Sequence, residues 1–534
     1  MRRSKIFSFL QRERGSRRSN SLVRVGVALA TAVAMTMTVA ACGGGSGGSS
    51  GASASDTVTI AVDADSAANG YDALLYSQAQ FQFFASVYDA LFVTAKDGTV
   101  TPSLVTNTAN NADNTQLTLT LRDGVTFTDG STLDATLVKA NLDRRSDPDL
   151  AAYQQFAPGG GAEITNVAAP DAKTVVITWA KPQAAGQQYL VDTSGVIIGK
   201  DGVANPDTLA TAPDGSGPYT LNTGATTKGS TYSFAKNDKA WNVGSFAFKN
   251  VAWKVITDPQ ARANAVISGQ ADVAIPLGGD TVDLVRSKQT VAQNGGNIAG
   301  FPVFDKLGKT NPAFGVLAVR QALVLGIDRE TLVTQLHPGA RATSQLFPEG
   351  TVGFDPALDA AWAYNPDKAK QLLAQGGYPD GFSFDLVVLG QPDVDQVAIQ
   401  KQWQAIGVNM NFVTATSTDA AFAAVGTTPL GWGTQFAMSN PLGFVQGVLY
   451  GGFMNLQKAT DPAIDKALGE ASATTGAAQE AALKDLNAAI TTSGWFITVY
   501  ESFTYLGYNA KKVTEPAFAG TSAFIILSSI KPAA

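Results

Sequence analysis

The helix with the clearest boundaries in this sequence reads Asn365-Pro366-Asp367-Lys368-Ala369-Lys370-Gln371-Leu372-Leu373-Ala374-Gln375-Gly376-Gly377. Asn365 is a residue type that caps helices, Pro366 suits the first helical position, and Asp367 complements the positive end of the helix dipole. Apolar residues follow at helical spacing, and the glycine pair at 376–377 can end the helix in a left-handed conformation. The segment therefore predicts a short amphipathic helix.

Strands and further helices are predicted on both sides of it. Residues 57–63 alternate between apolar and polar side chains and predict a strand. Residues 116–128 predict a hairpin, in which a tight Asp-Gly turn joins two alternating strands. Asp134 is expected to cap the helix that follows, and residues 314–330 predict one more helix. Because strands and helices continue to alternate, the fold class is mixed, either α/β or α+β.

The composition is globular but contains few catalytic or metal-binding side chains. Hydrophobic residues make up 45% of the chain and charged residues 15%, and 534 residues suggest roughly three domains. One Cys and one His exclude a disulfide framework, a Cys/His metal site and Cys–His catalysis. The histidine, His337, lies in a Leu-His-Pro-Gly segment typical of a turn. The sequence contains neither a phosphate-binding glycine loop nor a Ca²⁺-loop pattern, so no cofactor is expected.

The N-terminal residues have the pattern of a targeting segment. Basic residues are concentrated before residue 25, and an uncharged apolar stretch follows over 25–41. This stretch is short for a membrane span and suits the core of a signal peptide. It ends in Val39-Ala40-Ala41-Cys42, which resembles a bacterial lipobox. We therefore expect Cys42 to carry lipid and to anchor the protein at the outer face of the cytoplasmic membrane.

Alternatives to this anchor remain open. Cleavage after an Ala-x-Ala-like site would give a secreted protein with an incidental thiol, and Arg17-Arg18 would also fit a twin-arginine export signal. Residues 43–55, rich in Gly and Ser, predict a flexible tether of roughly 20 Å. Eight basic residues but one acid precede Cys42, so the remainder is more acidic than the net charge of −6 for the whole chain implies. Such a body would repel phosphates, and no nucleic-acid partner is expected.

Six motifs follow one another along the chain. They are Leu-Arg-Asp-Gly-Val-Thr-Phe-Thr-Asp-Gly at 121–130, Gly-Ser-Gly-Pro-Tyr at 215–219, Lys-Asn-Asp-Lys-Ala-Trp at 236–241, Ser-Gly-Gln-Ala-Asp-Val-Ala at 268–274, Val-Arg-Gln-Ala-Leu at 319–323 with Ile-Asp-Arg-Glu at 327–330, and the segment 364–381 that contains the helix above. Each alone is a turn, a cap or a packing device. In this order they resemble the oligopeptide/dipeptide/nickel-type solute-binding proteins of ABC importers.

The resemblance implies an α/β fold with two lobes, like that of periplasmic binding proteins, and an extra domain inserted in the first lobe. The expected divisions are a signal peptide at 1–41, a tether at 42–55, a first lobe at 56–300 with the inserted domain at about 86–190, a second lobe at 301–498, and a C-terminal segment at 499–534 that rejoins the first lobe. Crossovers near 300–304 and 499–502 are expected to form a hinge, and the lobes are expected to close around a solute.

The resemblance also suggests ligand contacts. In members that bind peptides, a Trp begins a loop of the second lobe, and an Asp shortly after it grips the α-amine of the peptide. Trp432 matches this Trp, but no acid lies between it and Pro441. We therefore take Trp432, Gln435 and Phe436 as candidate contacts, with core packing as the alternative for Trp432. First-lobe candidates are Tyr76, Gln80 and Phe83, and weaker ones are Tyr153 and Gln155.

The function that the resemblance implies is binding without catalysis. A membrane-anchored monomer would capture a peptide-like or other small solute between its lobes and deliver it to the permease and ATPase subunits of an ABC importer. A ligand sensor or adhesin that reuses the fold is one alternative, and a surface hydrolase with paired carboxylates is another. Turnover of a ligand would indicate the hydrolase, and a gene neighbourhood without permease genes would favour the sensor.

The loop at 433–440 bears on the nature of the solute. An ammonium group buried between closed lobes requires a carboxylate, whereas this loop offers amides and hydroxyls. Trp432 and Phe436 could stack on a sugar ring or an aromatic group. We therefore expect a neutral or N-blocked solute, unless another acid such as Asp419 or an Asp of the first lobe reaches the site. Bare nickel is disfavoured because the single histidine, His337, lies in the predicted turn.

Overall fold

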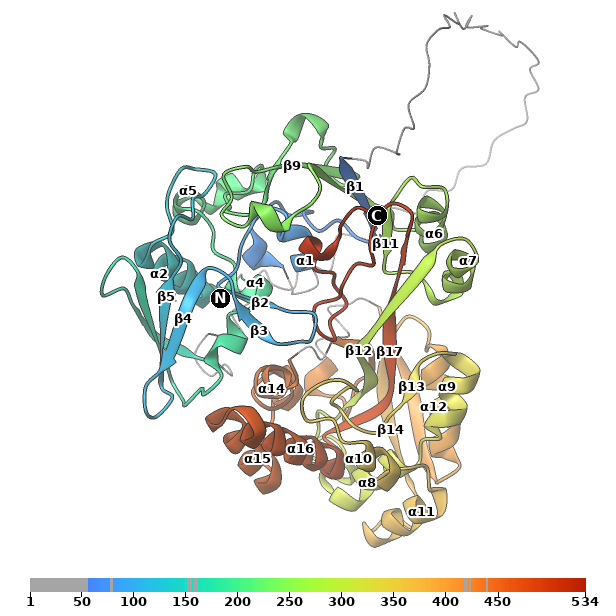
Figure 1. Cartoon of the computed structure of the whole chain (residues 1–534). Coiled ribbons are helices and arrows are strands. Elements are labelled where there is room, and N and C mark those ends of the chain that lie inside the picture. Colours follow the sequence, from blue (N-terminus) through green and yellow to red (C-terminus); the bar gives the residue numbers. More distant parts are fainter. Residues whose placement is uncertain are drawn as a thin grey trace, which may run out of the picture.

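The computed structural model describes residues 56–76, 80–148, 150, 156, 162–416, 421, 424–437 and 440–534, without the side chains at 425, 435–437 and 453. The predictions for the signal peptide, for Cys42 and for the tether lie outside these residues, as do those for Tyr153, Gln155 and Asp419. The described chain forms an upper and a lower lobe, which two long strands connect (Figure 1).

One sheet runs through both lobes. In order across the sheet lie β16 (Gly433–Ala437), β12 (Thr290–Pro302), β17 (Phe496–Tyr508), β11 (Val273–Ile275), β1 (Thr57–Val62), β10 (Asn250–Val255), β9 (Thr231–Lys236) and β8 (Tyr219–Leu221), and β13 (Arg341–Ala342) also pairs with β17. β1 is parallel to β10 and β11, and the remaining pairs are antiparallel. The strand predicted at 57–63 is confirmed as β1.

The two long strands, β12 and β17, connect the lobes. They pair antiparallel from Thr290 opposite Tyr508 to Pro302 opposite Phe496. The register shifts twice along β12, once between residues 294 and 297 and once between residues 299 and 300. In Figure 1 both strands run side by side from the upper lobe into the lower lobe. The chain therefore crosses between the lobes in a two-stranded ribbon, which is suited to act as a hinge.

The upper lobe has a second sheet of its own. It is antiparallel, in the order β4 (Val105–Asn110), β5 (Gln116–Leu121), β7 (Thr174–Trp179) and β6 (Ile164–Ala168), and α2 (Ala135–Asp143) packs against its core. The remaining elements of this lobe are the hairpin β2 (Phe92–Thr94) and β3 (Val100–Pro102) and the helices α1 (Phe81–Phe84), α4 (Asp192–Gly195), α5 (Lys200–Ala204), α6 (Pro259–Ile267) and α7 (Val282–Arg286).

The lower lobe is mainly helical. Its parallel strand pair is β14 (Phe382–Leu389) and β15 (Val408–Ala415). Its helices are α8 (Leu317–Leu325), α9 (Arg329–Leu336), α10 (Pro356–Ala361), α11 (Pro366–Gln375), α12 (Val394–Gln404), α14 (Pro441–Phe444), α15 (Pro462–Ala473) and α16 (Gly476–Ser493), and a π-helical turn follows α14 at Val445–Tyr450. Two hydrophobic cores fill the lobe, one around Trp403 and one around Trp495.

Hydrogen bonds also join the upper lobe to α15, which lies in the lower lobe away from the β12–β17 ribbon (Figure 1). The backbone N–H of Ala184 donates to the carbonyl of Ser472 in α15, with N and O 2.9 Å apart. The Asn114 side chain reaches the carbonyl of Ala473 at 3.5 Å. Asn110 donates to the carbonyl of Ala184 at 2.7 Å and so orients that segment. We call the contacts of Ala184 and Asn114 with α15 the interlobe latch.

Local sequence signals at helix ends are confirmed. The Asn365 side chain accepts from the N–H of Lys368 at the start of α11, and Gly377 beyond its end has φ of +89°. Asp134 caps α2 by accepting from the N–H of Leu137. His337 ends α9 and leads into a turn at residues 338–339, as its sequence context predicts.

Two longer-range predictions are wrong. The hairpin over 116–128 does not form, because β4 and β7 occupy both edges of β5. Residues after β5 instead fold on themselves, with Phe127 N–H donating to Ser131 and Leu133 N–H to Val125. The single helix predicted over 314–330 is divided into α8 and α9. Asp328 causes the break by accepting from a backbone N–H at the start of α9, in place of helix continuation.

Candidate functional site: the cleft between the lobes

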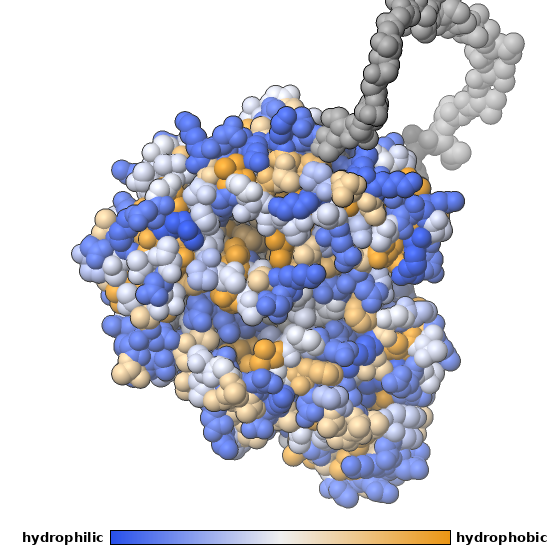
Figure 2. All heavy atoms as spheres, viewed as in Figure 1, coloured by the Kyte–Doolittle hydropathy of each residue, from blue (hydrophilic) through white to orange (hydrophobic). Residues whose placement is uncertain are grey.

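A cavity of about 1080 Å³ lies between the two lobes. Its size lies just above the range of about 300–1,000 Å³ that is usual for small-molecule sites. Figure 2 shows this face of the molecule hollowed between its upper and lower parts, with hydrophobic residues among the polar ones there. The β12–β17 ribbon supplies the wall nearest the hinge, and both lobes supply the others.

The upper wall is built from segments far apart in sequence. It includes Tyr76, Thr94 and residues 96–100 around the tip of the β2–β3 hairpin, Gln187, Gln188, Val191, Thr193 and Ser194 before and within α4, and Gly520 with Thr521 near the C-terminus. Gly520 has φ of +55°, and a Cβ there would lie 2.8 Å from the Cα of Gly98. The C-terminal segment can therefore reach the hairpin tip only with glycine at this position.

The hinge wall is held by polar contacts between β12 and the C-terminal segment. Asn294 of β12 lines the cleft, and its side-chain nitrogen donates to the carbonyls of Gly520 at 2.8 Å and Ser522 at 2.7 Å. Gly296 follows at the first register shift with φ of +110°, where a Cβ would lie 2.2 Å from the carbonyl oxygen of Thr521. This close packing fixes the backbone at the upper end of the ribbon.

The lower wall comes from helices of the second lobe and one loop. It includes residues 349–352, residues 440–444 at α14, and Gly447 with Val448 on the π-helical turn. Gln479 and Leu483 of α16 complete it. Asn440 caps α14 by accepting from the N–H of Gly443 at 2.9 Å. The wall therefore combines polar groups with the apolar side chains of Leu442, Phe444, Val448 and Leu483.

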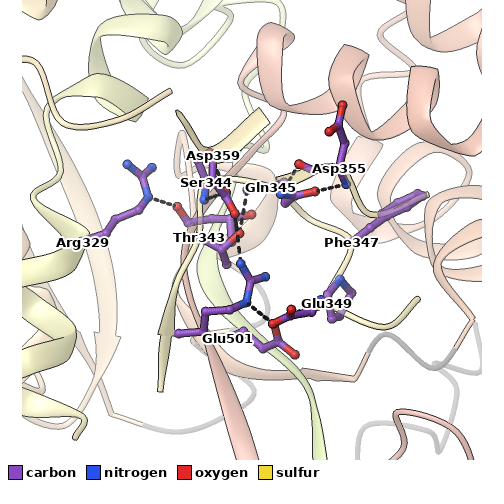
Figure 3. Close-up of polar contacts among 12 residues, drawn as sticks. Arg329, Thr343, Ser344, Gln345, Phe347, Glu349, Asp355, Asp359 and Glu501 are labelled. Atoms are coloured by element: carbon purple, nitrogen blue, oxygen red, sulfur yellow. Dashed lines mark hydrogen bonds and ion pairs between the residues drawn. The ribbon is translucent and has the colours of Figure 1, made fainter. Parts of the chain in front are cut away.

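A network of charged side chains lies behind the hinge wall (Figure 3). Glu501 of β17 lines the cleft, although only 1% of the residue is exposed. Its Oε2 accepts from Arg341 Nε at 2.9 Å and from the N–H of Glu349 at 3.2 Å, and its Oε1 accepts from the N–H of Gly296 at 3.0 Å. Glu501 therefore joins β12, β17 and the loop of the lower wall at a single carboxylate.

Arg341 is shared among three carboxylates. Besides Glu501, it binds Asp359 Oδ2 through Nη1 at 3.0 Å and lies 3.6 Å from Glu349 Oε2. The hydroxyls of Thr343 and Ser344 also donate to Asp359. Burial raises the pKa of Asp359, but the hydrogen bonds from the N–H of Ser344 and the hydroxyl of Thr343, together with the charge of Arg341, outweigh it and hold this pKa below its usual value. One guanidinium thus faces three carboxylates, so the cluster is negative.

A smaller cavity of about 250 Å³ lies beside the cleft in the upper lobe. Asp89 lines it and accepts from Ser216 Oγ at 2.8 Å, Trp241 Nε1 at 2.9 Å and Asn242 Nδ2 at 2.8 Å. Burial raises the pKa of Asp89 to about 6 despite these donors. Phe81, Phe246 and Phe524 line the same cavity, which is therefore mainly apolar around a saturated carboxylate.

The first-lobe residues suggested from sequence do not share one location. Tyr76 lines the cleft, and its hydroxyl donates to the carbonyl of Gly70 at 3.0 Å. Gln80 occupies the capping position immediately before α1. Phe83 is 1% exposed and packs among four aromatic rings of the core, those of Phe84, Tyr232, Phe234 and Trp253. The structure thus places Tyr76 at the cleft and Phe83 inside the lobe.

The second-lobe candidates lie beside β12. Trp432 packs on Phe301 with ring centroids 4.6 Å apart, and its Nε1 donates to Asp393 at 2.8 Å. It lies outside the lining of the cleft. Gln435 and Phe436 belong to β16, whose backbone pairs with β12, and their side chains are outside the described structure. Their contact with a solute therefore stays a prediction.

Sequence reasoning missed the charged residues of the cleft. The charged residues of its lining are Lys96, Asp97, Glu349 and Glu501. Lys96 and Asp97 lie at the tip of the β2–β3 hairpin, Glu349 lies in a loop and Glu501 lies in the middle of β17, and only the folded chain brings them together. Within the described part of the chain, no three His, Cys, Asp or Glu side chains could hold a metal ion. No helix of that part is long and apolar enough to cross a membrane.

Comparison with known sequences agrees with the ordered motifs. A family model described as bacterial extracellular solute-binding proteins, family 5 Middle, matches residues 99–454. A similar relative is the glutathione-binding protein GsiB of Salmonella paratyphi A, which is 30% identical over 310 residues. That alignment covers 56% of this chain and 58% of the relative, so the chain spans little more than half the length of this relative.

Solved structures share the fold over most of the chain. HbpA2 from Haemophilus parasuis has a TM-score of 0.74 at 20% identity, covering 89% of this chain and 99% of that one. The ABC transporter-associated periplasmic binding protein DppA from Helicobacter pylori has a TM-score of 0.69 at 19% identity, with 89% and 98% covered. At these identities the similarity concerns the fold alone. It confirms the predicted two-lobe α/β class.

Proposed function

Because the chain belongs to the bacterial extracellular solute-binding proteins of family 5, we propose that it captures a peptide-like or other small solute in the cleft and delivers it to an ABC importer. Membership confirms the family that the six motifs predict. The observation that carries the proposal is the cavity of about 1080 Å³, which both lobes and the connecting ribbon line together. A solute that touches both lobes favours their closed arrangement by its differential affinity.

The proposal includes no catalytic step and no cofactor. GsiB is named for binding glutathione, and DppA is described in complex with a peptide, which supports a peptide-like solute here. The partners would be the permease and ATPase subunits, and the protein would act as a monomer. The divisions at residues 300–304 and 499–502 fall within the β12–β17 ribbon or next to it, which supports their proposed role as hinge.

We further propose that Cys42 anchors the protein at the outer face of the cytoplasmic membrane. The lipobox-like segment before Cys42 supports this. Cys42→Ala is expected to leave the protein without lipid, so fractionation should find it away from the membrane or as an uncleaved precursor. A processed mutant, identified by its mass, that stays as firmly bound to membranes as the native protein would contradict the anchor.

Blocking the cleft tests the capture of a solute there. Gly447 lines the cleft, and a Cβ added to it meets no atom within 4 Å, so Gly447→Trp should place a bulky indole in the cavity with no clash at its Cβ. Gly244→Trp is the matched control, because Gly244 is exposed and equally uncrowded but lies outside the cleft. Mass spectrometry should find a small molecule that copurifies with the native protein and the control.

Gly447→Trp should lose that molecule while its melting temperature without solute stays unchanged. Peptide pools added to the stripped protein should raise the melting temperature of the native protein and of the control by mass action. If the blocked variant retains the same molecule with the same affinity, the solute lies elsewhere and the proposed site is wrong. If nothing copurifies and no pool binds, the proposed function itself fails.

A further inference from the structure

We infer that the smaller cavity of the upper lobe is a second ligand site, which takes an uncharged aromatic molecule of one or two fused rings and influences the solute cleft. The two cavities are neighbours, since Thr94 lines both. The influence on the cleft rests on the proposed function, whereas the site itself does not. The observation behind the inference is that one turn of the C-terminal segment forms a wall of each cavity.

The smaller cavity has the size and the walls of a site for an aromatic ring. Its volume of about 250 Å³ exceeds the roughly 150 Å³ of apolar cavity that can hold benzene, so a ring system such as indole fits. Its apolar lining includes Phe81, Val93, Trp241, Phe246, Phe524 and Leu527. Phe81 and Phe524 meet edge to face, with ring centroids 6.2 Å apart. Because aromatic rings pack favourably on one another in such geometries, these walls favour an aromatic occupant.

The two carboxylates of the lining disfavour a charged ligand. Asp89 accepts three side-chain hydrogen bonds, shared between its two oxygens. The two oxygens of Asp192 accept from the N–H of Thr94 at 3.1 Å and from its hydroxyl at 2.6 Å. An anion would be repelled by these buried carboxylates, and a cation would give up its hydration for oxygens that protein donors already occupy. An uncharged molecule avoids both costs.

A single turn of the C-terminal segment connects the smaller cavity with the cleft. The N–H of Ala519 donates to the carbonyl of Phe524 at 3.1 Å and closes this turn. Ala519 and residues 524–528 line the smaller cavity, whereas residues 520–521 at the tip line the cleft. Figure 1 shows the C-terminal segment, in red, beside α1, which supplies another wall of the smaller cavity. A ligand in this cavity therefore packs on the base of a turn whose tip belongs to the solute site.

The tip of this turn is also bonded to the ribbon between the lobes. Asn294 of β12 donates to the carbonyls of Gly520 and Ser522. A Cβ at Gly296 would clash with the carbonyl oxygen of Thr521, so the two backbones are in close contact. A ligand that restrains the turn thus helps to hold the hinge wall as it is here, with the interlobe latch formed. Since the solute favours that arrangement, ligand and solute should each raise the affinity for the other by the same factor.

Indole is the probe for the site, titrated against the full chain by ligand-observed NMR and calorimetry. Ser245→Trp blocks the smaller cavity, because Ser245 lines it and is exposed. Ser230→Trp is the matched control, since Ser230 is exposed and lines neither cavity. One indole should bind each native or control chain, and Ser245→Trp should lose it while its melting temperature without ligand stays unchanged. Indole-3-acetate and tryptamine, which add a negative or a positive charge to the same ring, should bind at least about tenfold more weakly.

Two further titrations separate the site from the cleft and measure the coupling. Indole should still bind Gly447→Trp, in which the cleft is blocked. Saturating indole should lower the Kd for the copurified solute about fivefold in the native protein and in Ser230→Trp, and should leave it unchanged in Ser245→Trp. These results together would support the inference.

The contrary outcomes are equally distinct. Failure of indole to bind the native protein, native affinity in Ser245→Trp, or loss of indole binding in Gly447→Trp would overturn the second site. Bound indole that leaves the Kd for the solute unchanged would overturn the coupling between the cavities. If no solute copurifies and no peptide pool binds, the proposed function fails, but the indole titrations of the native protein and of Ser245→Trp still decide whether the second site exists.

Discussion

Replacing Glu501 by Gln tests whether one carboxylate holds the ribbon to the lower wall. Glutamine keeps one acceptor oxygen, which can still serve the N–H of Gly296. Its amide nitrogen would face Arg341 Nε and the N–H of Glu349, both of which are donors. The change thus removes two hydrogen bonds to the carboxylate, the ion pair with Arg341, about 1.5–3 kcal/mol, and the longer bond from the N–H of Glu349, about 1 kcal/mol. Because Arg341 keeps Asp359 as a partner, no guanidinium is left fully unpaired.

The expected net loss is about 2–4 kcal/mol in the free energy of unfolding, after relief of carboxylate burial is taken into account. Urea unfolding followed by tryptophan fluorescence measures this loss as a lower midpoint at an unchanged slope. Glu349→Gln is the control. Its side chain is 66% exposed, so the loss there should stay within about 1 kcal/mol. A loss below about 1 kcal/mol for Glu501→Gln would refute the view that this carboxylate holds the ribbon.

Three further predictions concern other parts of the chain. Burial raises the pKa of Asp89 from 3.8 to about 6, so its protonation stabilises the fold fully below about pH 4, and this stabilisation is lost as the pH rises through 6. Urea titrations should show that the free energy of unfolding of the native protein falls by about 3 kcal/mol more over this pH range than that of Asp89→Asn. Parallel pH profiles for the two proteins would contradict the raised pKa of this carboxyl. Ala184→Pro removes the N–H that donates to Ser472 in the interlobe latch, and one such hydrogen bond contributes about 1 kcal/mol. Calorimetry should therefore find the Kd for the solute raised about fivefold. An unchanged Kd would show that the latch does not favour the solute-bound form. Asn365→Ala removes the cap of α11 and should lower the free energy of unfolding by about 1 kcal/mol, whereas Asn365→Gly should lose only a few tenths.

The parts of the fold that sequence predicts well depend on neighbouring residues. Asn365 and Asp134 accept hydrogen bonds from the N–H three residues ahead, so the information for each cap lies within a few positions. The wrong hairpin after β5 has the opposite origin. Its Asp-Gly turn is a sound local signal, but β4 and β7 take both edges of β5, and that pairing depends on residues up to some sixty positions away.

The cleft was harder to predict than the fold for the same reason. An aromatic residue such as Phe83 or Trp432 looks alike in sequence whether it packs in a core or faces a solute. Phe83 lies among other rings because β9 and β10 pass over it, a contact that no local pattern contains. Glu349 and Glu501 are 152 positions apart, and their hydrogen bond exists only because the loop after β13 returns to β17. Family resemblance indicated a cleft, while its charged residues required the folded chain.

If the protein delivers its solute to an importer as proposed, the interlobe latch has a further consequence. Its strongest bond joins two main-chain groups, the N–H of Ala184 and the carbonyl of Ser472, so it forms in the same way whatever the solute is. Such a bond stabilises the closed arrangement of the lobes by about 1 kcal/mol, so the solute has to supply less binding free energy to close them. Solutes that are dilute or fit poorly are then retained more readily. The same bond enlarges the fraction of empty molecules that are already shut and that compete with loaded ones for the transporter. A stronger bond at this position thus improves the capture of scarce solutes but increases the number of empty closed molecules that bind the transporter.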